Sequence, residues 1–271
     1  MKGVPLASVR LRQPVPDPVQ LLCAAKNYKD GRETPKADFF LKAQGTIVGP
    51  GDTVDLPPVE ARVFHAEPEL AVVIGKKAAN VKASNAMDYV FGYTICNDVS
   101  ARQRQGERFK MGQPYSYAKN FATFCPMGPW IVTAKEMPNP RNLKQEVRIN
   151  GKVRRRGNTK DMIFDPFQVI AYCSDYAPLE AGDVISLGTY AGDKDLHAGD
   201  KVELVTDKLG TLFRPSYFDT SGDAIHGEGD TNSGSNVPAY PASHGCVRIT
   251  DSAVDRYYDT FAVGVPVWIY Y

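Results

Sequence analysis

The chain has 271 residues, which allows one or two domains with a substantial buried core. Its 32 Lys and Arg residues nearly balance its 31 Asp and Glu residues, so the charge gives no general reason to expect binding to nucleic acid or to a membrane. A hydrophobic content of 43% is ordinary for a soluble globular protein. We find neither a signal segment nor an apolar run of membrane-spanning length and therefore expect a cytoplasmic protein.

The cysteines are odd in number and widely spaced along the chain. They are Cys23, Cys96, Cys125, Cys173 and Cys246. Several follow apolar residues, as in Leu21-Leu22-Cys23, which is typical of buried thiols. This distribution indicates free thiols in a reducing compartment, and it does not indicate a disulfide framework.

Short apolar runs, separated by turns rich in Gly, Pro and Asp, predict many short strands. In chain order, we expect strands at residues 19–25, 67–75, 91–96, 130–132, 184–187, 201–206, 209–213 and 265–271, and a hairpin at 145–155. Short helices are expected at 83–89, 165–173 and 252–258, a turn at 126–129, and a polar segment at 97–105 where strand 91–96 ends. This succession predicts a mainly β fold with short helices and a rolled or barrel-like architecture.

One acidic pair stands at the start of a long apolar run. Glu67 and Glu69 flank Pro68 and precede Leu70–Gly75, which is typical of a buried strand. Because side chains alternate along a strand, the two carboxylates project to the same face. A solvated pair at a strand entrance would satisfy the pattern, and so would a site for a hard cation such as Mg²⁺ or Mn²⁺.

Further motifs occur in a fixed order from residue 18 to residue 213. They are Asn27-Tyr28, Phe40-Leu41-Lys42, Glu67–Gly75, Asn97–Arg102 with Gln105, Lys119-Asn120-Phe121, Cys125–Trp130, Asn150-Gly151, Gly182–Ile185 and Gly188-Thr189. Taken together, they resemble the fumarylacetoacetate hydrolase family. The resemblance implies a mixed β-roll for residues 1–213, and a dimer, because family members are usually dimeric.

The same resemblance implies a Mg²⁺ or Mn²⁺ site made by Glu67, Glu69 and Asp98. Its substrates would be small β-dicarbonyl or 2-oxo acids, such as an acylpyruvate, that chelate the metal and react through a metal-stabilised enolate. Lys119 matches the active-site lysine of the family. The residues that match substrate-contacting positions are Arg102, Gln105 and Thr189.

The general base is the part of the family pattern that this chain does not reproduce. Many hydrolases of the family carry a His shortly after Asn-Tyr, paired with a Glu, whereas Gly31 stands about where that His would fall. Glu33 is a possible remnant of the pair, and His65 is a possible substitute base. Isomerase, decarboxylase and tautomerase chemistry therefore stays open beside C–C bond hydrolysis.

The C-terminal segment resembles a second family, the L,D-transpeptidases of the YkuD type. The resemblance is carried by Ala224–Gly227, Pro241–Arg248 and Val263–Tyr270. It implies that Cys246 is a nucleophile, with His226 or His244 as its base, Ser243 in a supporting role and Arg248 in peptide binding. Only the last part of that family's β-sandwich is matched, and about 55 residues are few for a well-buried core of their own.

These observations give two domains, a metal-dependent catalytic domain at 1–213 and a partial transpeptidase-like β segment at 214–271. The leading hypothesis is an Mg²⁺- or Mn²⁺-dependent hydrolase, isomerase or decarboxylase acting on a small 2-oxo or β-dicarbonyl acid. The alternatives are a cysteine acyltransferase centred on Cys246 and acting on peptidoglycan peptides, and a metal-binding scaffold without catalysis.

Overall fold

The computed structural model describes residues 9–29, 36–57, 63–192 and 195–214, and the backbone of 225–227 and 247–249. The chain divides into two compact units. The larger unit, Leu11–Phe218, contains the motifs that resemble the hydrolase family. In the other unit, Met1–Arg10 with Asp219–Tyr271, two described strands pair in parallel, β15 (Ile225–Gly227) and β16 (Val247–Ile249).

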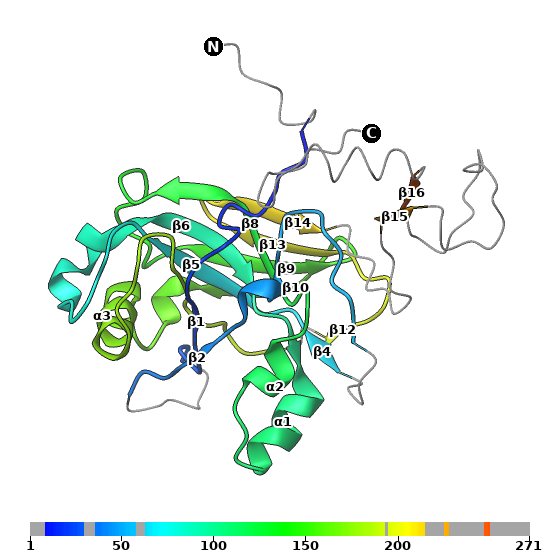
Figure 1. Cartoon of the computed structure of the whole chain (residues 1–271), viewed down its shortest axis with the longest axis horizontal. Coiled ribbons are helices and arrows are strands. Elements are labelled where there is room, and N and C mark those ends of the chain that lie inside the picture. The colour runs from blue at the N-terminus through cyan, green and yellow to red at the C-terminus, as the bar shows by residue number, and fades with distance from the viewer. Residues whose placement is uncertain are drawn as a thin grey trace. The chain divides into compact units, whose positions relative to one another are not determined.

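The larger unit is built around a mixed sheet of seven strands (Figure 1). Its order is β2 (Phe39–Leu41), β1 (Leu21–Ala24), β11 (Val184–Ser186), β5 (Pro68–Ile74), β6 (Val90–Asn97), β8 (Cys125–Thr133) and β3 (Ile47–Val48). β1 runs parallel to β11 and β3 runs parallel to β8, while the other neighbours are antiparallel. The central strand β5 is buried along its whole length, which explains its continuous apolar sequence.

A second, antiparallel sheet packs against the first. It consists of β10 (Lys152–Asn158), β9 (Lys144–Ile149), β13 (Val202–Thr206) and β14 (Gly210–Arg214). Alternate residues of β9 and β13 are buried, and Val147 and Leu204 join Leu70 and Val72 of β5 in one hydrophobic core. Burial of these side chains between the two sheets is the main source of stability for this arrangement.

The remaining elements surround the ends of the two sheets. A three-stranded sheet contains β12 (Asp195–Leu196), β4 (Phe64–His65) and β7 (Ser100–Ala101). The helices are α1 (Arg102–Lys110), α2 (Ser116–Lys119), α3 (Pro166–Tyr176) and the 3₁₀ turns at Gln44–Thr46, Ala83–Tyr89 and Thr159–Asp161. α1 and α2 lie side by side next to β4 (Figure 1). Within the described ranges, no helix has both the length and the apolar character needed to cross a bilayer.

The mainly β fold with short helices is confirmed, and several local predictions hold. Asn150 and Gly151 have φ angles of 53° and 74° and form the tight turn of the β9–β10 hairpin. α3 begins at the expected place because Asp165 accepts hydrogen bonds from the backbone of Phe167 and Gln168, which completes a capping box. Cys23, Cys96, Cys125 and Cys173 are buried free thiols, whereas Cys246 lies outside the described residues.

One local prediction is wrong, and one helix was not predicted. Residues 126–129 do not form a turn, because they belong to β8, where a cis peptide bond precedes Pro129 and Pro126 lies next to the short strand β3. The polar segment after β6 was assigned no element beyond the end of the strand, but from Arg102 the chain forms the nine-residue helix α1. The helix is almost entirely polar and contains a glycine, so no apolar periodicity announces it.

Candidate metal and substrate site

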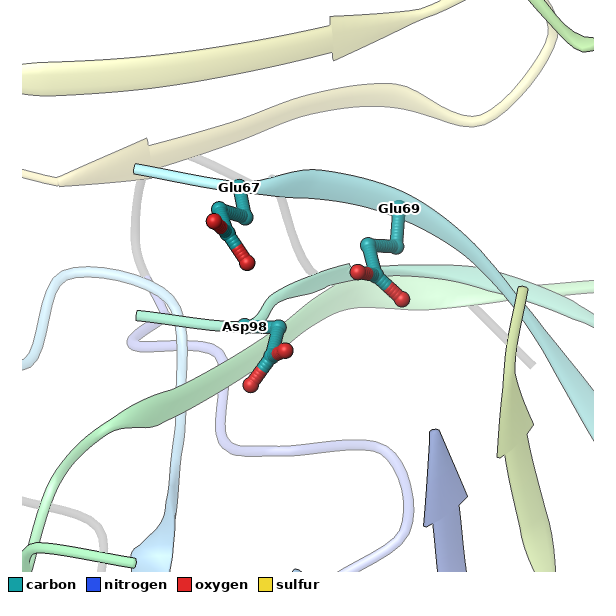
Figure 2. Close-up of side chains that lie close together, drawn as sticks. All are labelled: Glu67, Glu69 and Asp98. Atoms are coloured by element: carbon teal, nitrogen blue, oxygen red, sulfur yellow. The ribbon is translucent and has the colours of Figure 1, made fainter. Parts of the chain in front are cut away.

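Three buried carboxylates converge at the ends of β5 and β6. Glu67 and Glu69 point from the same side of one chain segment toward Asp98, as Figure 2 shows. Their side chains offer one oxygen each, and these oxygens all lie within 4.8 Å of one another. The three residues are 6%, 2% and 1% exposed, so the pair at the strand entrance is not solvated. The structure therefore brings together all three of the residues that the resemblance assigned to metal.

Strand pairing fixes the relative positions of these carboxylates. In the antiparallel register of β5 and β6, Pro68 lies opposite Asn97 and Glu69 lies opposite Cys96. The backbone N–H of Asp98 donates to the carbonyl of Glu67 at 2.9 Å, and the Asn97 side chain accepts from the backbone N–H of Glu67 at 2.9 Å. The segments that carry the carboxylates are thus held together by backbone contacts independent of any ion.

Two buried lysines compensate part of this negative charge. The ammonium group of Lys119 donates to Glu67 at 2.7 Å and to Ser100 at 2.7 Å, and it also contacts Asp98. Lys42 reaches the other oxygen of Asp98 at 2.5 Å. Burial alone would lower the pKa of both lysines, but the adjacent carboxylates outweigh burial and hold each pKa above its ordinary value. Both lysines are therefore cationic donors at neutral pH and do not serve as bases.

Glu69 is held by neutral donors. Its carboxylate accepts from the Ser186 hydroxyl at 2.5 Å and from the backbone N–H of Gly188 at 2.8 Å. Gly188 has a φ of 88°, which allows the turn after β11 to aim this N–H at the carboxylate. Burial, and next the charge of Asp98, raise the pKa of Glu69 to about 8.

The donor set fits a hard divalent cation. Three carboxylates face two ammonium groups, so the cluster retains an excess of negative charge when all five groups are ionised. The available ligand atoms are oxygens, which Mg²⁺ and Mn²⁺ prefer, and no thiol or imidazole belongs to the described group. Glu67, Glu69 and Asp98 are accordingly the residues that would hold such an ion.

The carboxylates face a cavity of about 450 Å³, a size that suits a small organic acid. Its wall includes Lys119, Arg102, Gln105 and Thr189, which the resemblance assigned to the active site, and also His65. Arg102 and Gln105 come from the first turn of α1 and are joined by a 2.5 Å hydrogen bond. The Arg102 guanidinium lies 3.8 Å from Glu67, so a positive group stands beside the carboxylates at the cavity wall.

Of the two candidate general bases, His65 lies among the described residues and Glu33 does not. His65 lies on β4, a separate strand from β5, and its Nε2 pairs with Asp195 of β12 at 2.7 Å. It reaches the cavity all the same, with a side chain that is 18% exposed. Glu33 lies outside the described residues.

Three site residues were missed as functional candidates in the sequence. Lys42 lies within a family motif, but nothing in its local pattern shows that it reaches Asp98, 56 residues away. Ser100 and Ser186 are small polar residues in buried strands, and both bond to the acidic cluster. Ser186 is a hydroxyl at the end of an apolar run, which is a weak signal because serine is common, and Ser100 lies within the Asn97–Arg102 motif but was given no role of its own.

Most residues that carry the transpeptidase resemblance lie outside the described part of the chain. Ser243, His244 and Cys246 lie outside the described residues. His226 and Arg248 are partners in the β15–β16 pairing, and nothing is described of their side chains. The comparisons with known proteins give the transpeptidase resemblance no support, since the family model that matches covers only residues 18–215.

Comparison with known proteins agrees with the first resemblance. The oxaloacetate tautomerase YisK of Bacillus subtilis is 38% identical over 223 residues, which is 76% of this chain and 73% of that protein. The structure of a 5-carboxymethyl-2-hydroxymuconate delta-isomerase from Mycobacterium smegmatis is similar with a TM-score of 0.71 and 37% identity, over 79% of this chain and 82% of the other.

A maleylpyruvate hydrolase from Sphingobium sp. SYK-6, solved with manganese(II) and pyruvate, has a TM-score of 0.69 and 34% identity, over 78% of this chain and 75% of the other. The family model described as fumarylacetoacetate (FAA) hydrolase C-terminal matches residues 18–215. With this match and these relatives, the chain belongs to the fumarylacetoacetate hydrolase family.

Proposed function

We propose that residues 1–213 form an Mg²⁺- or Mn²⁺-dependent enzyme that interconverts the keto and enol forms of a small 2-oxo acid of the oxaloacetate class. The observation that carries the proposal is the buried cluster of Glu67, Glu69 and Asp98, braced by Lys119, at the floor of a cavity of suitable size. When bound there, the divalent cation would polarise the 2-oxo carbonyl and stabilise negative charge on its oxygen.

The chain's own residues supply orientation. Arg102, Gln105 and Thr189 line the cavity and offer donors for the acid end of the substrate. Lys119 is held in place by Glu67, Asp98 and Ser100, so its ammonium group is a fixed positive charge beside the reacting carbonyl. Such a preorganised charge stabilises an enolate without reorganisation during the reaction.

Tautomerisation moves one proton between a carbon and the enol oxygen, and it needs a group that can carry that proton. We assign this role to His65, because it lines the cavity and Asp195 orients its ring through Nε2 at 2.7 Å. The two lysines do not fit the role, since their carboxylate neighbours hold them protonated.

C–C bond hydrolysis of an acylpyruvate is the second candidate. It shares the enolate with tautomerisation but also requires a base that activates water. The relative solved with manganese(II) and pyruvate favours this candidate, since its name is that of a hydrolase. The tautomerase reading is supported by the name of the Bacillus relative, and tautomerisation itself requires no activated water.

The test is a direct assay of enol-oxaloacetate conversion, followed by the loss of enol absorbance, with an acylpyruvate cleavage assay in parallel. We expect conversion to be lost with EDTA and restored by Mn²⁺ or Mg²⁺. His65→Ala should lower kcat by about 10²- to 10⁴-fold, the usual contribution of a general acid–base residue.

His197→Ala is the matched control, because His197 also pairs with an aspartate but is largely exposed and away from the cavity wall. It should leave kcat unchanged. Undiminished conversion in EDTA would refute metal dependence, and acylpyruvate cleavage without tautomerisation would establish the second candidate. The dimer and the cysteine acyltransferase stay predictions from the sequence.

A further inference from the structure

One face of α1 lines the cavity over two helical turns. Its residues have the three- and four-residue spacing that places them on one side of a helix, and they are Arg102, Gln105, Gly106 and Phe109. Arg102 lies 3.8 Å from Glu67, next to the acidic cluster. Phe109 comes seven residues later, about 10 Å further along the helix axis. The cavity wall therefore extends from the acidic cluster to Phe109.

Lys26 contributes a positive charge at the Phe109 end of this wall. Its Nζ lies 5.1 Å from the centroid of the Phe109 ring, and both residues line the cavity. Both are also exposed, so neither is sealed off from a ligand that enters the cavity. In the described part of the chain, no carboxylate forms an ion pair with Lys26. A cation–π contact leaves the three N–H donors of its ammonium group available to an anion.

The backbone of Lys26 is held in a conformation that lysine rarely adopts. Its φ angle is 52°, in the left-handed region that favours glycine. On one side of Lys26, the N–H of Ala25 donates to the carbonyl of Asp38 at 2.9 Å. On the other side, the buried side chain of Asn27 donates to the carbonyl of Leu187 at 2.9 Å. Strained backbone persists only where its surroundings impose it, and it gathers at ligand-binding sites, so this conformation is a second indication of such a role.

We propose that Lys26 is a specificity-determining residue whose ammonium group binds the distal carboxylate of a 2-oxo diacid. This inference rests on the proposed function, which places the 2-oxo acid head of the substrate at Glu67, Glu69 and Asp98. From there the carbon chain of the substrate extends along α1 toward Phe109. A carboxylate at that end supplies an anionic partner for Lys26, and the Phe109 ring excludes water from one side of the pair.

The experiment compares two 2-oxo acids with the same number of carbons, titrated by calorimetry into the Mn²⁺-loaded protein. 2-Oxoadipate carries a distal carboxylate, whereas 2-oxohexanoate ends in a methyl group. We expect the wild type to bind 2-oxoadipate about 5- to 20-fold more tightly, between the effects of an exposed ion pair and of a buried charged hydrogen bond. Lys26→Gln should lose this preference, while its affinities for 2-oxohexanoate and for Mn²⁺ change by less than twofold.

Lys29→Gln is the matched control, because it removes the same charge from the same segment. Lys29 is exposed and is absent from the cavity wall, so this variant should keep the wild-type preference for 2-oxoadipate.

Lys26→Gly separates ligand binding from a structural role. It removes the ammonium group and relieves the backbone strain at Lys26, so it should lose the preference while its melting temperature stays at or above that of the wild type. A purely structural contact between Lys26 and Phe109 predicts the opposite, a lower melting temperature with the preference retained.

Equal affinities of the wild type for the two acids, or equal losses for both acids in Lys26→Gln, would overturn the assignment of Lys26 while leaving the proposed function standing. A Mn²⁺-loaded wild type that binds neither acid would overturn the proposed 2-oxo acid substrate and this inference with it.

Discussion

Lys119→Met should destabilise the metal-free protein by about 3–5 kcal/mol, and saturating Mn²⁺ should restore much of that loss. Lys119 is 3% exposed and neutralises Glu67 and Asp98, so its removal leaves buried carboxylates without compensation. A cation among these carboxylates supplies the missing charge, and a ligand at one hundred times its Kd adds about 2.7 kcal/mol. The measurement is urea unfolding in EDTA and in Mn²⁺.

Lys77→Met provides the control for this prediction. Lys77 also forms an ion pair at 2.7 Å, with Glu180, but its side chain is 69% exposed. Exposed pairs contribute about 0–1 kcal/mol, so this variant should unfold almost like the wild type and should not respond more strongly to Mn²⁺. If Lys119→Met bound Mn²⁺ more weakly than the wild type, the ammonium group would assist binding of the cation. The interpretation that Lys119 and the cation neutralise the same carboxylates would then be wrong.

Glu69→Gln and Asp98→Asn should both abolish high-affinity metal binding, but only Asp98→Asn should destabilise the metal-free protein. Asp98 pairs with two buried ammonium groups, so Asp98→Asn leaves them undercompensated and should cost about 3–5 kcal/mol. Glu69 is held by Ser186 and the Gly188 N–H, and a glutamine oxygen can accept from both donors. Burial and the charge of Asp98 raise the pKa of Glu69 to about 8, so this carboxyl is mostly protonated at neutral pH and its replacement by neutral glutamine should be neutral or stabilising.

Asp88→Asn is a suitable control, since Asp88 is exposed and its replacement should change stability by no more than about 0.5 kcal/mol. All three variants can be compared by urea unfolding in EDTA. Equal destabilisation by Glu69→Gln and Asp98→Asn would contradict the distribution of charge described for the site.

The elements that the sequence predicts well are those with local causes. The shared face of Glu67 and Glu69 follows from the two-residue period of a strand, and the start of α3 follows from the Asp165 cap. The β9–β10 hairpin follows from the turn preference of Asn150-Gly151. In each case the residues that decide the structure are neighbours in the chain.

The features of the site that no local pattern reveals depend on distant partners. A lysine is usually exposed, and only the carboxylates of Glu67 and Asp98 make the burial of Lys119 favourable. Lys42 directly follows β2, which the sheet order separates from β6 by three strands, so no local pattern reveals its contact with Asp98. His65 stands two residues before Glu67 in the sequence, but it belongs to a separate strand, β4, which pairs with β12.

The most direct test of the central claim is a calorimetric titration of the metal-free protein with Mn²⁺ and Mg²⁺, on the wild type and on Glu67→Gln. The site predicts saturable binding of one ion per chain to the wild type and loss of that binding in the variant, with the fold retained. A folded wild type that binds neither ion, or a variant that binds as tightly as the wild type, would contradict a metal site at Glu67, Glu69 and Asp98.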